Sequence, residues 1–128
     1  MQKKEQLEQI AVSNYIKNVY PRILFTIAPS GMKLSHNVAG KFKAMGYSAG
    51  TPDIMIFQPN KKYHGLFIEL KLKELRDADG RVYQRAGKPT GFQREWIARL
   101  NEAGYCAVIC YGSRSAMDFI DTYMLLIP

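Results

Sequence analysis

The sequence predicts an α/β fold in which a mixed sheet of about four strands is flanked by helices. Two observations lead to this prediction. Hydrophobic patterns of helical and strand-like period follow one another in the order helix, strand, short helix, strand, strand, helix, strand, helix. Of the 128 residues, 47% are hydrophobic, which is enough for the core of a single domain spanning residues 1–128.

The first expected element is a helix over residues 3–19, a stretch without proline or glycine. Apolar side chains recur along it at helical spacing, at Leu7, Ala11, Tyr15 and Val19. Residues 22–28 follow as a strand, because they are apolar and rich in β-branched side chains. Pro29-Ser30-Gly31 then ends this strand.

A short helix is expected next, after a loop at residues 32–35, and it reaches Met45. We expect Asn37 to cap this helix. Its apolar side chains are expected to point inward and its lysines outward, with Val38, Phe42 and Met45 opposed to Lys41 and Lys43. Gly46 follows and ends the helix.

Residues 50–73 are predicted to form a β-hairpin. Two apolar runs, residues 54–57 and 66–72, flank a polar turn at residues 58–64 that contains Pro59 and Asn60. In the second run the side chains alternate between two faces, with Leu66, Ile68, Leu70 and Leu72 on one and Phe67, Glu69, Lys71 and Lys73 on the other.

This hairpin places two carboxylates together. If it is symmetric about Lys61, Asp53 lies opposite Glu69, with Cβ atoms about 4.5–5.5 Å apart. Like charges at that separation destabilise a sheet, so we expect a hard divalent cation between them, with the Lys71 ammonium on the same face. A solvated strand face and a turn cap after Pro52 are the alternative explanations for these residues.

The segment from Glu74 to Gly91 is polar and rich in glycine and basic residues. A loop of this length in a compact domain is usually functional or mobile. We interpret it as a basic arm for a phosphate backbone, with Arg76, Arg81, Arg85 and Lys88 as its cations. The alternative is a solvated excursion with a small hairpin around Asp79-Gly80.

The last third of the chain predicts helix, strand and helix. Thr90 to Gln93 is a capping-box pattern, so Gln93 has a purely structural explanation as well as a functional one. The helix is expected to reach Ala103, with Phe92, Trp96, Ile97 and Leu100 inward and Gly104 as its stop. Residues 105–111 are expected to be an interior strand, and the final helix to start at Ser113 or Ser115 and end near Leu125.

Composition limits the classes of function. The net charge of +7 suits a polyanionic partner. No apolar run approaches the roughly 20 residues that span a bilayer, and the N-terminus lacks the apolar centre of a signal peptide, so we expect a cytoplasmic protein. Cys106 and Cys110 are expected to be buried free thiols, and the two histidines form no zinc site.

Pro52-Asp53 and Glu69-Leu70-Lys71 together resemble the PD-(D/E)XK nuclease signature, a short pattern that also arises by chance. An ordered set of motifs resembles more specifically the VRR-NUC (virus-type replication–repair nuclease) branch of that superfamily. The set covers nearly the whole chain and comprises Glu5-x-x-x-Gln9 with Tyr15, Tyr20-Pro21, Pro29-Ser30-Gly31, Ala39-Gly40, Lys43-Ala44-x-Gly46, Gly50-x-Pro52-Asp53, Gly65-Leu66-Phe67-Ile68-Glu69-x-Lys71, Gln93-x-x-Trp96, Leu100 and Gly104-Tyr105.

The resemblance implies a restriction-endonuclease-like core with a Mg²⁺ or Mn²⁺ site. The metal ligands would be Asp53, Glu69 and the backbone carbonyl of Leu70. Lys71 would position or activate the attacking water, Glu5 would complete the site, and Gln93 would touch it. Two points depart from this pattern or stay open. Ser30 stands where the family often has asparagine, and Glu8 competes with Glu5 because it lies nearer the apolar arc of its helix.

The function that we expect is a metal-dependent endonuclease for branched DNA such as Holliday junctions. Its DNA-binding residues would be Lys41, Lys43, Lys73, Arg76, Arg81, Arg85 and Lys88. The alternatives are a basic nucleic-acid-binding module that does not cleave, and a nuclease for RNA or single strands. Stand-alone viral members of the family are typically dimers, so we also expect a homodimer, located in the host cytoplasm if the chain is viral. The apolar residues 123–128 would be its shared surface or would pack on the chain's own sheet.

Overall fold

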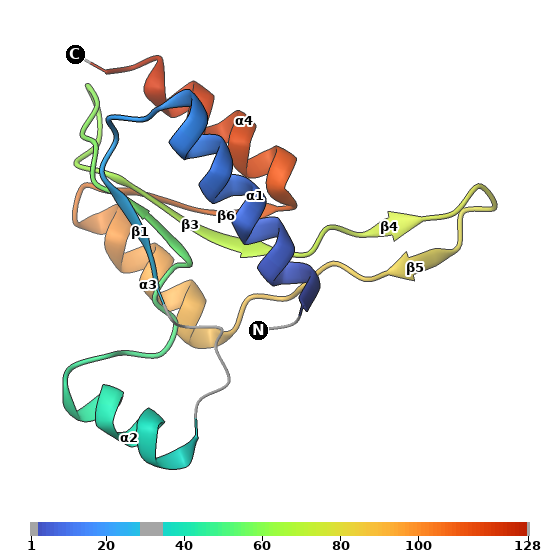
Figure 1. The fold of residues 1–128 in the computed structure, drawn as a ribbon, viewed down its shortest axis with the longest axis horizontal. Coiled ribbons are helices and arrows are strands. Elements are labelled where there is room, and N and C mark those ends of the chain that lie inside the picture. The colour runs from blue at the N-terminus through green and yellow to red at the C-terminus, as the bar shows by residue number, and fades with distance from the viewer. Residues whose placement is uncertain (1–2, 29–34, 128) are drawn as a thin grey trace.

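A computed structural model describes residues 3–28 and 35–127. The elements in these segments follow the predicted order, with one additional small hairpin (Figure 1). They are α1 (Lys3–Val19), β1 (Phe25–Ile27), α2 (His36–Ala44), β2 (Ile54–Ile56), β3 (Leu66–Lys71), β4 (Leu75–Arg76), β5 (Val82–Gln84), α3 (Gly91–Glu102), β6 (Cys106–Tyr111) and α4 (Ser113–Met124).

The main sheet has four strands in the order β1–β2–β3–β6. The β1–β2 and β2–β3 pairs are antiparallel, whereas β3 and β6 run parallel, so the sheet is mixed. The connection from β3 to β6 includes α3, as parallel neighbours require a long crossover. These features confirm the predicted fold class.

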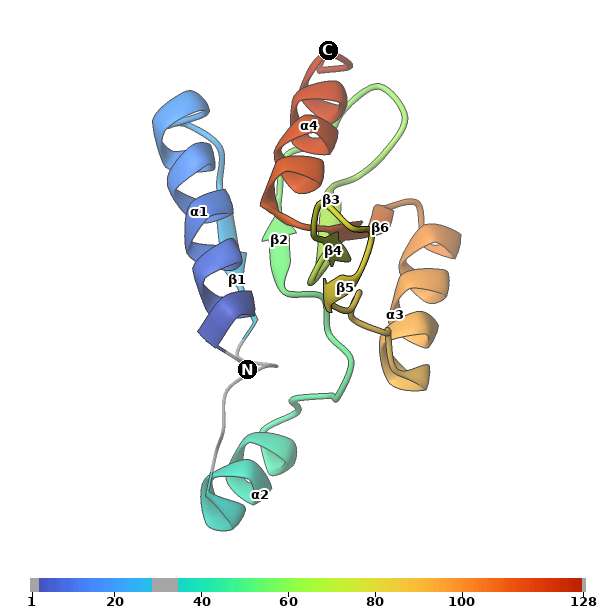
Figure 2. The same ribbon diagram turned by 90° about the vertical axis from the view of Figure 1, so that its right-hand side faces the viewer.

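Helices cover both faces of this sheet: α1 and α4 lie on one face and α3 on the other (Figure 2). On the first face, the alternate β3 residues Leu66, Ile68 and Leu70 join the core with side chains of α1 and α4. On the second face Phe67 stacks on Tyr105, with ring centroids 5.1 Å apart. Because both faces of β3 are covered, its polar face is buried as deeply as its apolar one.

In the segment before the β2–β3 hairpin, two predictions are wrong and a third lies outside the described residues. The first strand is only Phe25–Ile27, so its prediction over residues 22–28 is wrong in length. The predicted cap of α2 is also wrong: Ser35 caps it, not Asn37, because the Ser35 Oγ accepts a hydrogen bond from the N–H of Val38 at 3.3 Å. Pro29-Ser30-Gly31 lies outside the described residues.

The α2 helix does not pack on the core. None of its residues is buried, and Val38 and Met45, which we expected inward, are 40% and 75% exposed. Figures 1 and 2 show it displaced from the layered body, beyond the ends of β1 and β2. The apolar stripe of α2 therefore has no covering partner within the part of the chain that is described.

The basic segment after β3 contains the small hairpin that the alternative interpretation placed around Asp79-Gly80. The β4 and β5 strands pair there and extend away from the body (Figure 1). Its turn is held by Asp77, whose Oδ1 accepts hydrogen bonds from the N–H groups of Asp79 and Arg81, both at 2.9 Å. Gly80 has a φ of +81°, a conformation in which glycine avoids the steric cost of a Cβ.

The helix after the hairpin is capped as predicted: Thr90 and Gln93 form the full capping box of α3. Trp96, Ile97 and Leu100 are half-buried against the sheet side, whereas Phe92, also expected inward, is 64% exposed. Phe92 lies in the first turn of α3, where the helix begins.

The C-terminal apolar segment divides into two parts. Tyr123 and Met124 are buried in the chain's own core, while Leu125 is 83% and Ile127 36% exposed. Pro128 lies outside the described residues. Cys106 and Cys110 are buried free thiols, as expected. Over residues 3–28 and 35–127, no helix is long and apolar enough to cross a membrane.

Candidate active site

Two carboxylates face each other across the β2–β3 pair. The register pairs Ile54 with Ile68 and Ile56 with Leu66, so one step further it sets Asp53 opposite Glu69, as the symmetry about Lys61 predicts. Asp53 is 7% and Glu69 2% exposed. The Asp53 Oδ2 accepts a hydrogen bond from the N–H of Leu70 at 2.8 Å, which directs this carboxylate across the strand boundary toward Glu69.

The electrostatic environment of Glu69 disfavours its charged form. Burial raises the pKa of Glu69 the most, and the negative charge of Asp53 raises it further. Lys71 lowers this pKa only in part, so that it reaches about 9. Its Oε1 accepts a hydrogen bond from the Gln93 Nε2 at 2.9 Å, and the Lys71 Nζ lies 3.9 Å from the same atom. The second oxygen, Oε2, is buried and has no hydrogen-bond partner. An unpartnered carboxylate oxygen beside a second carboxylate is a site that would favour a cation.

Gln93 has both of the roles that the sequence left open. Its Oε1 accepts the N–H of Thr90 at 2.8 Å within the capping box, and its Nε2 donates to Glu69. Gly50 makes this placement possible, because its φ is +94° and a Cβ there would lie 2.5 Å from the carbonyl carbon and oxygen of Phe92. The close approach of Gly50 holds the start of α3 against the start of β2.

Lys71 is held at the site by the chain that returns from β5. The N–H of Gly87 donates to the carbonyl of Leu72 at 3.0 Å, and a Cβ at Gly87 would lie only 3.2 Å from the Lys71 Cδ. The Lys71 side chain is consequently only 11% exposed. Its methylene stem is covered, and its ammonium group faces Glu69.

The structure separates the two acids of α1. Glu8 Oε2 accepts a hydrogen bond from the N–H of Ser113 at 2.6 Å, so it caps the start of α4. Glu5 is half-exposed and lies close enough to raise the pKa of Glu69 by its negative charge. Of the two, Glu5 is therefore the acid near the carboxylate pair.

Gln9 is a residue that sequence reasoning assigned no role of its own. It is 6% exposed, and its Nε2 is buried without a hydrogen-bond partner, one helical turn after Glu5. A buried unpaired amide donor is uncommon in proteins. The four-residue spacing from Glu5 was the sequence signal that could have identified it.

The residues at this site fit a divalent metal ion. Across the described residues, no group of three His, Cys, Asp or Glu side chains is arranged to hold one. Asp53 and Glu69 supply two carboxylates, and the third predicted ligand, the Leu70 carbonyl, belongs to the main chain. The unpartnered Glu69 Oε2 is the observation that favours this assignment, since carboxylate oxygens are the donors that Mg²⁺ and Mn²⁺ prefer.

The predicted DNA-binding residues fall into two groups. Lys41 and Lys43 are exposed on α2, and the other five follow β3, the β4–β5 hairpin and its return: Lys73, Arg76, Arg81, Arg85 and Lys88. Arg76 also binds within its own hairpin, to the Glu74 Oε2 at 3.3 Å and the Gly80 carbonyl at 2.8 Å. All seven side chains are exposed, so the structure leaves them accessible to a phosphate backbone.

Comparisons with known proteins identify the family and the fold. A family model described as VRR-NUC domain matches residues 3–114. A solved structure described as a VRR_NUC domain protein covers 99% of this chain and 93% of its own length, with a TM-score of 0.71 and 29% sequence identity. A search of curated proteins found no match.

Proposed function

Because the chain belongs to the VRR-NUC domain family and has a nuclease-type fold, we propose that it is a divalent-metal-dependent endonuclease that hydrolyses phosphodiester bonds in branched DNA. The observation that carries the proposal is the buried, opposed pair Asp53 and Glu69, with Lys71 beside it. A module that only binds nucleic acid has no need for two carboxylates that are buried opposite each other inside a sheet.

Asp53, Glu69 and the Leu70 carbonyl would hold Mg²⁺ or Mn²⁺. When bound, such an ion supplies charge neutralisation at the phosphodiester and a lowered pKa for a water molecule. The chain's own contribution is to hold its ligands in place. The Leu70 N–H orients Asp53, and the Gln93 Nε2 orients Glu69, so neither carboxylate needs to reorganise during the reaction.

Lys71 carries the positive charge that the chain itself adds to the site. Its ammonium lies 3.9 Å from Glu69, and its side chain is shielded from solvent by the return chain at Gly87. A fixed cation there would stabilise the negative charge that develops on the phosphoryl oxygens in the transition state and would position the attacking water. Glu5, on the neighbouring helix, completes the acidic side of the site, and the buried Gln9 amide is an available donor one turn later.

The basic side chains on α2 and on the β4–β5 hairpin would bind the DNA backbone. Between residues 73 and 88 the chain has five basic and three acidic side chains, and the hairpin extends beyond the body (Figure 1). Phosphate contacts of this kind give affinity and orientation without reading the base sequence. The protein would then select its DNA substrate by shape.

Two cuts are needed to resolve a four-way junction, whereas one small domain carries one such site. We therefore propose a two-fold homodimer that cuts junctions with paired, roughly symmetric nicks. Tyr123 and Met124 are buried in their own core, so among the described residues of the C-terminal segment Leu125, Leu126 and Ile127 remain for a shared surface.

The test is a cleavage assay of the full chain on labelled four-way junction, flap, duplex and single-stranded DNA, each with Mg²⁺, Mn²⁺ or EDTA. We expect cleavage of branched DNA with either metal, paired nicks in the junction, and no product in EDTA. Light scattering at micromolar concentration should give twice the chain mass of 14.6 kDa.

Each alternative has its own result in this assay. Metal-independent binding without any product would identify a non-cleaving module. Preferential cleavage of RNA or of single-stranded DNA would identify that nucleic acid, and not branched DNA, as the substrate. A monomeric mass, with junctions cut no better than duplex, would leave a generic metal-dependent nuclease.

A further inference from the structure

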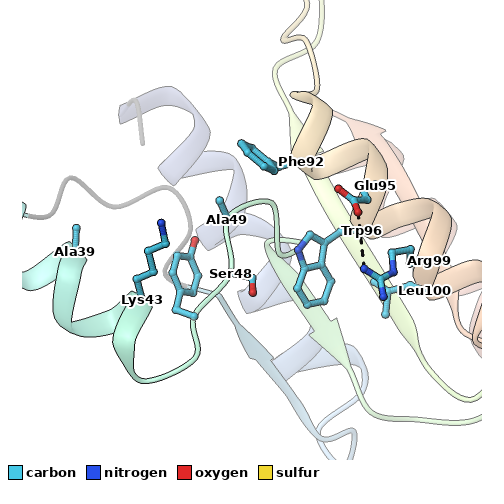
Figure 3. Close-up of a pocket in the computed structure, with 10 residues that line it drawn as sticks. Ala39, Lys43, Ser48, Ala49, Phe92, Glu95, Trp96, Arg99 and Leu100 are labelled. Atoms are coloured by element: carbon cyan, nitrogen blue, oxygen red, sulfur yellow. Dashed lines mark ion pairs between the residues drawn. The ribbon is translucent and has the colours of Figure 1, made fainter.

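A groove of about 760 Å³ lies between α2, the segment that follows it and α3 (Figure 3). It contains none of the residues of the candidate active site. Its volume is within the range of about 300–1,000 Å³ that small organic ligands occupy in proteins. A single nucleotide falls within that range of sizes.

Three aromatic side chains contribute to the lining of this groove: Tyr47, Phe92 and Trp96. Phe92 is 64% exposed, although it stands in the first turn of a well-capped helix. In Figure 3 Phe92 and Trp96 project from α3 on the side that faces Ala49. One exposed ring, Phe92, and two half-buried rings in the same groove offer flat apolar surfaces on which another ring can stack.

The rim of the groove is positively charged. Lys43 enters from α2, on the side opposite α3 (Figure 3). The acid in the lining, Glu95, has its Oε1 3.8 Å from the Arg99 Nη1, so a neighbouring cation offsets it. Residues 35–52, which include all of α2, contain two lysines, Lys41 and Lys43, and no Asp or Glu. This part of the chain complements a polyanion.

The groove and the candidate active site are linked through consecutive residues at the start of α3. Gln93 hydrogen-bonds Glu69, and the preceding residue, Phe92, lines the groove. Successive residues of a helix point about 100° apart, so the first turn of α3 presents one side chain to the carboxylates and the next to the groove. A DNA strand whose phosphate lies at Glu69 would therefore have a neighbouring nucleotide within reach of Phe92.

We propose that this groove binds an unpaired nucleobase of the DNA strand being cut, stacked on Phe92 and Trp96, with Lys43 at an adjacent phosphate. The inference rests on the proposed nuclease function and deepens it. According to this proposal, the protein recognises an unpaired base, such as one at a branch point or at a single-stranded end. Base–aromatic stacking tolerates any base, so this recognition would be of structure and not of sequence.

Trp96 is the single tryptophan of the chain, so its fluorescence reports on the groove alone. The full chain in EDTA is titrated with a duplex that carries a short single-stranded tail, and with the same duplex whose tail is abasic throughout. We expect quenching of Trp96 by the tailed duplex only, and binding of the abasic tail that is weaker by about tenfold because one base no longer stacks. Equal quenching and equal affinity for the two tails would overturn the proposal.

Substitution of Phe92 separates stacking from general DNA binding. Phe92→Ala should weaken binding of the normal tail by a similar factor and leave binding of the abasic tail unchanged. Tyr83 on β5, which is also 64% exposed, gives a matched control: Tyr83→Ala should keep the full difference between the two tails. Trp96→Phe, which retains an aromatic ring, should keep it too. Wild-type discrimination by Phe92→Ala would refute the groove assignment.

The outcomes distinguish this proposal from the proposed function. If the protein discriminates between the two tails in EDTA but cuts no DNA with any metal, the groove proposal stands and the nuclease function is refuted. If the protein cuts branched DNA and Phe92→Ala changes neither binding nor cleavage, only the groove proposal is refuted. Loss of a dimer by Phe92→Ala in light scattering would show that a second copy covers the groove, and would overturn the proposal.

Discussion

The two β-hairpins of this chain are neighbours in sequence and opposite in character. The β2–β3 hairpin is buried on both faces, and its turn is tied to the segment that follows α4 by a hydrogen bond from the Lys61 N–H to the Leu126 carbonyl, at 2.8 Å. The β4–β5 hairpin extends from the body, and its turn is held by its own Asp77. The first carries the opposed carboxylates, and the second carries Arg81 and Arg85.

This difference leads us to expect different effects from substitutions in the two hairpins. Two carboxyl groups that are buried opposite each other lower the stability of a sheet, and the surrounding packing and strand register keep them in place. Backbone binding requires only that cations reach phosphates, so an exposed hairpin with few contacts suffices. Substitutions in the first hairpin should therefore change the rate of cleavage, and substitutions in the second should change affinity and its salt dependence.

The largest effect is expected from the carboxylate pair. Glu69→Gln and Asp53→Asn should each abolish cleavage, because each removes a charged ligand from the proposed metal site while keeping the shape of the side chain. The measurement is junction cleavage with Mn²⁺, with circular dichroism to confirm the fold. Asp79→Asn, in the turn of the other hairpin, is the control and should cleave normally. Substantial cleavage by either of the first two variants would eliminate this site.

Stability should separate the two ligands. Asp53→Ala leaves the buried Leu70 N–H without its acceptor, which costs about 1–3 kcal/mol, whereas Asp53→Asn keeps an acceptor oxygen there. Glu69→Ala removes a carboxylate that the metal-free protein holds at an electrostatic disadvantage. Thermal unfolding in EDTA should therefore give a lower Tm for Asp53→Ala than for Glu69→Ala. The reverse order would contradict a stabilising role for the hydrogen bond from Leu70 to Asp53.

The next effect is expected at Lys71. Lys71→Ala should lower the single-turnover rate by about 10²–10³-fold, the usual size when a preorganised stabilising group is removed, and change DNA affinity far less. Lys73→Ala, two residues after Lys71, beyond the end of β3 and exposed, should do the opposite and mainly weaken binding. A defect of Lys71→Ala that lies wholly in affinity would make Lys71 a phosphate anchor and remove its catalytic role.

A smaller effect is expected from the exposed hairpin. Arg81→Gln with Arg85→Gln should flatten the slope of log K against log salt by about 0.9 for each phosphate that the variant no longer neutralises, with the rate at saturating DNA unchanged. Lys61→Gln with Lys62→Gln removes the same charge from the turn of the buried hairpin and serves as the control. Equal slopes for the two double variants would mean that the β4–β5 hairpin has no special part in binding.

The smallest effect is a pH dependence of stability in the metal-free protein. Folded Glu69 keeps its proton up to about pH 9, whereas the unfolded chain releases it near pH 4.5. Its contribution to stability is therefore complete below pH 4.5 and is lost as pH rises toward 9. In EDTA, Tm should fall less over this range for Glu69→Gln than for the wild type, and Glu95→Gln, exposed on α3, should follow the wild type.

Much of the candidate site could be predicted from local pattern. Two apolar runs around one polar turn define a hairpin, and its symmetry about Lys61 determines which residues oppose each other. The structure has that register, so Asp53 faces Glu69 as expected. The capping box at Thr90 and Gln93 was likewise visible, because it depends on residues three apart in one chain segment.

The sequence by itself therefore determined the α/β class, the hairpin register and the residues that meet across it, since each depends on interactions between near neighbours. Only the tertiary structure decided which residues far apart in the sequence come into contact. It separated Glu8, which caps α4, from Glu5, and it brought Gln93 to Glu69. It also left Phe92 exposed and α2 without a covering partner in the described chain. These outcomes depend on how whole elements dock, and helical periodicity records an apolar face without recording what covers it.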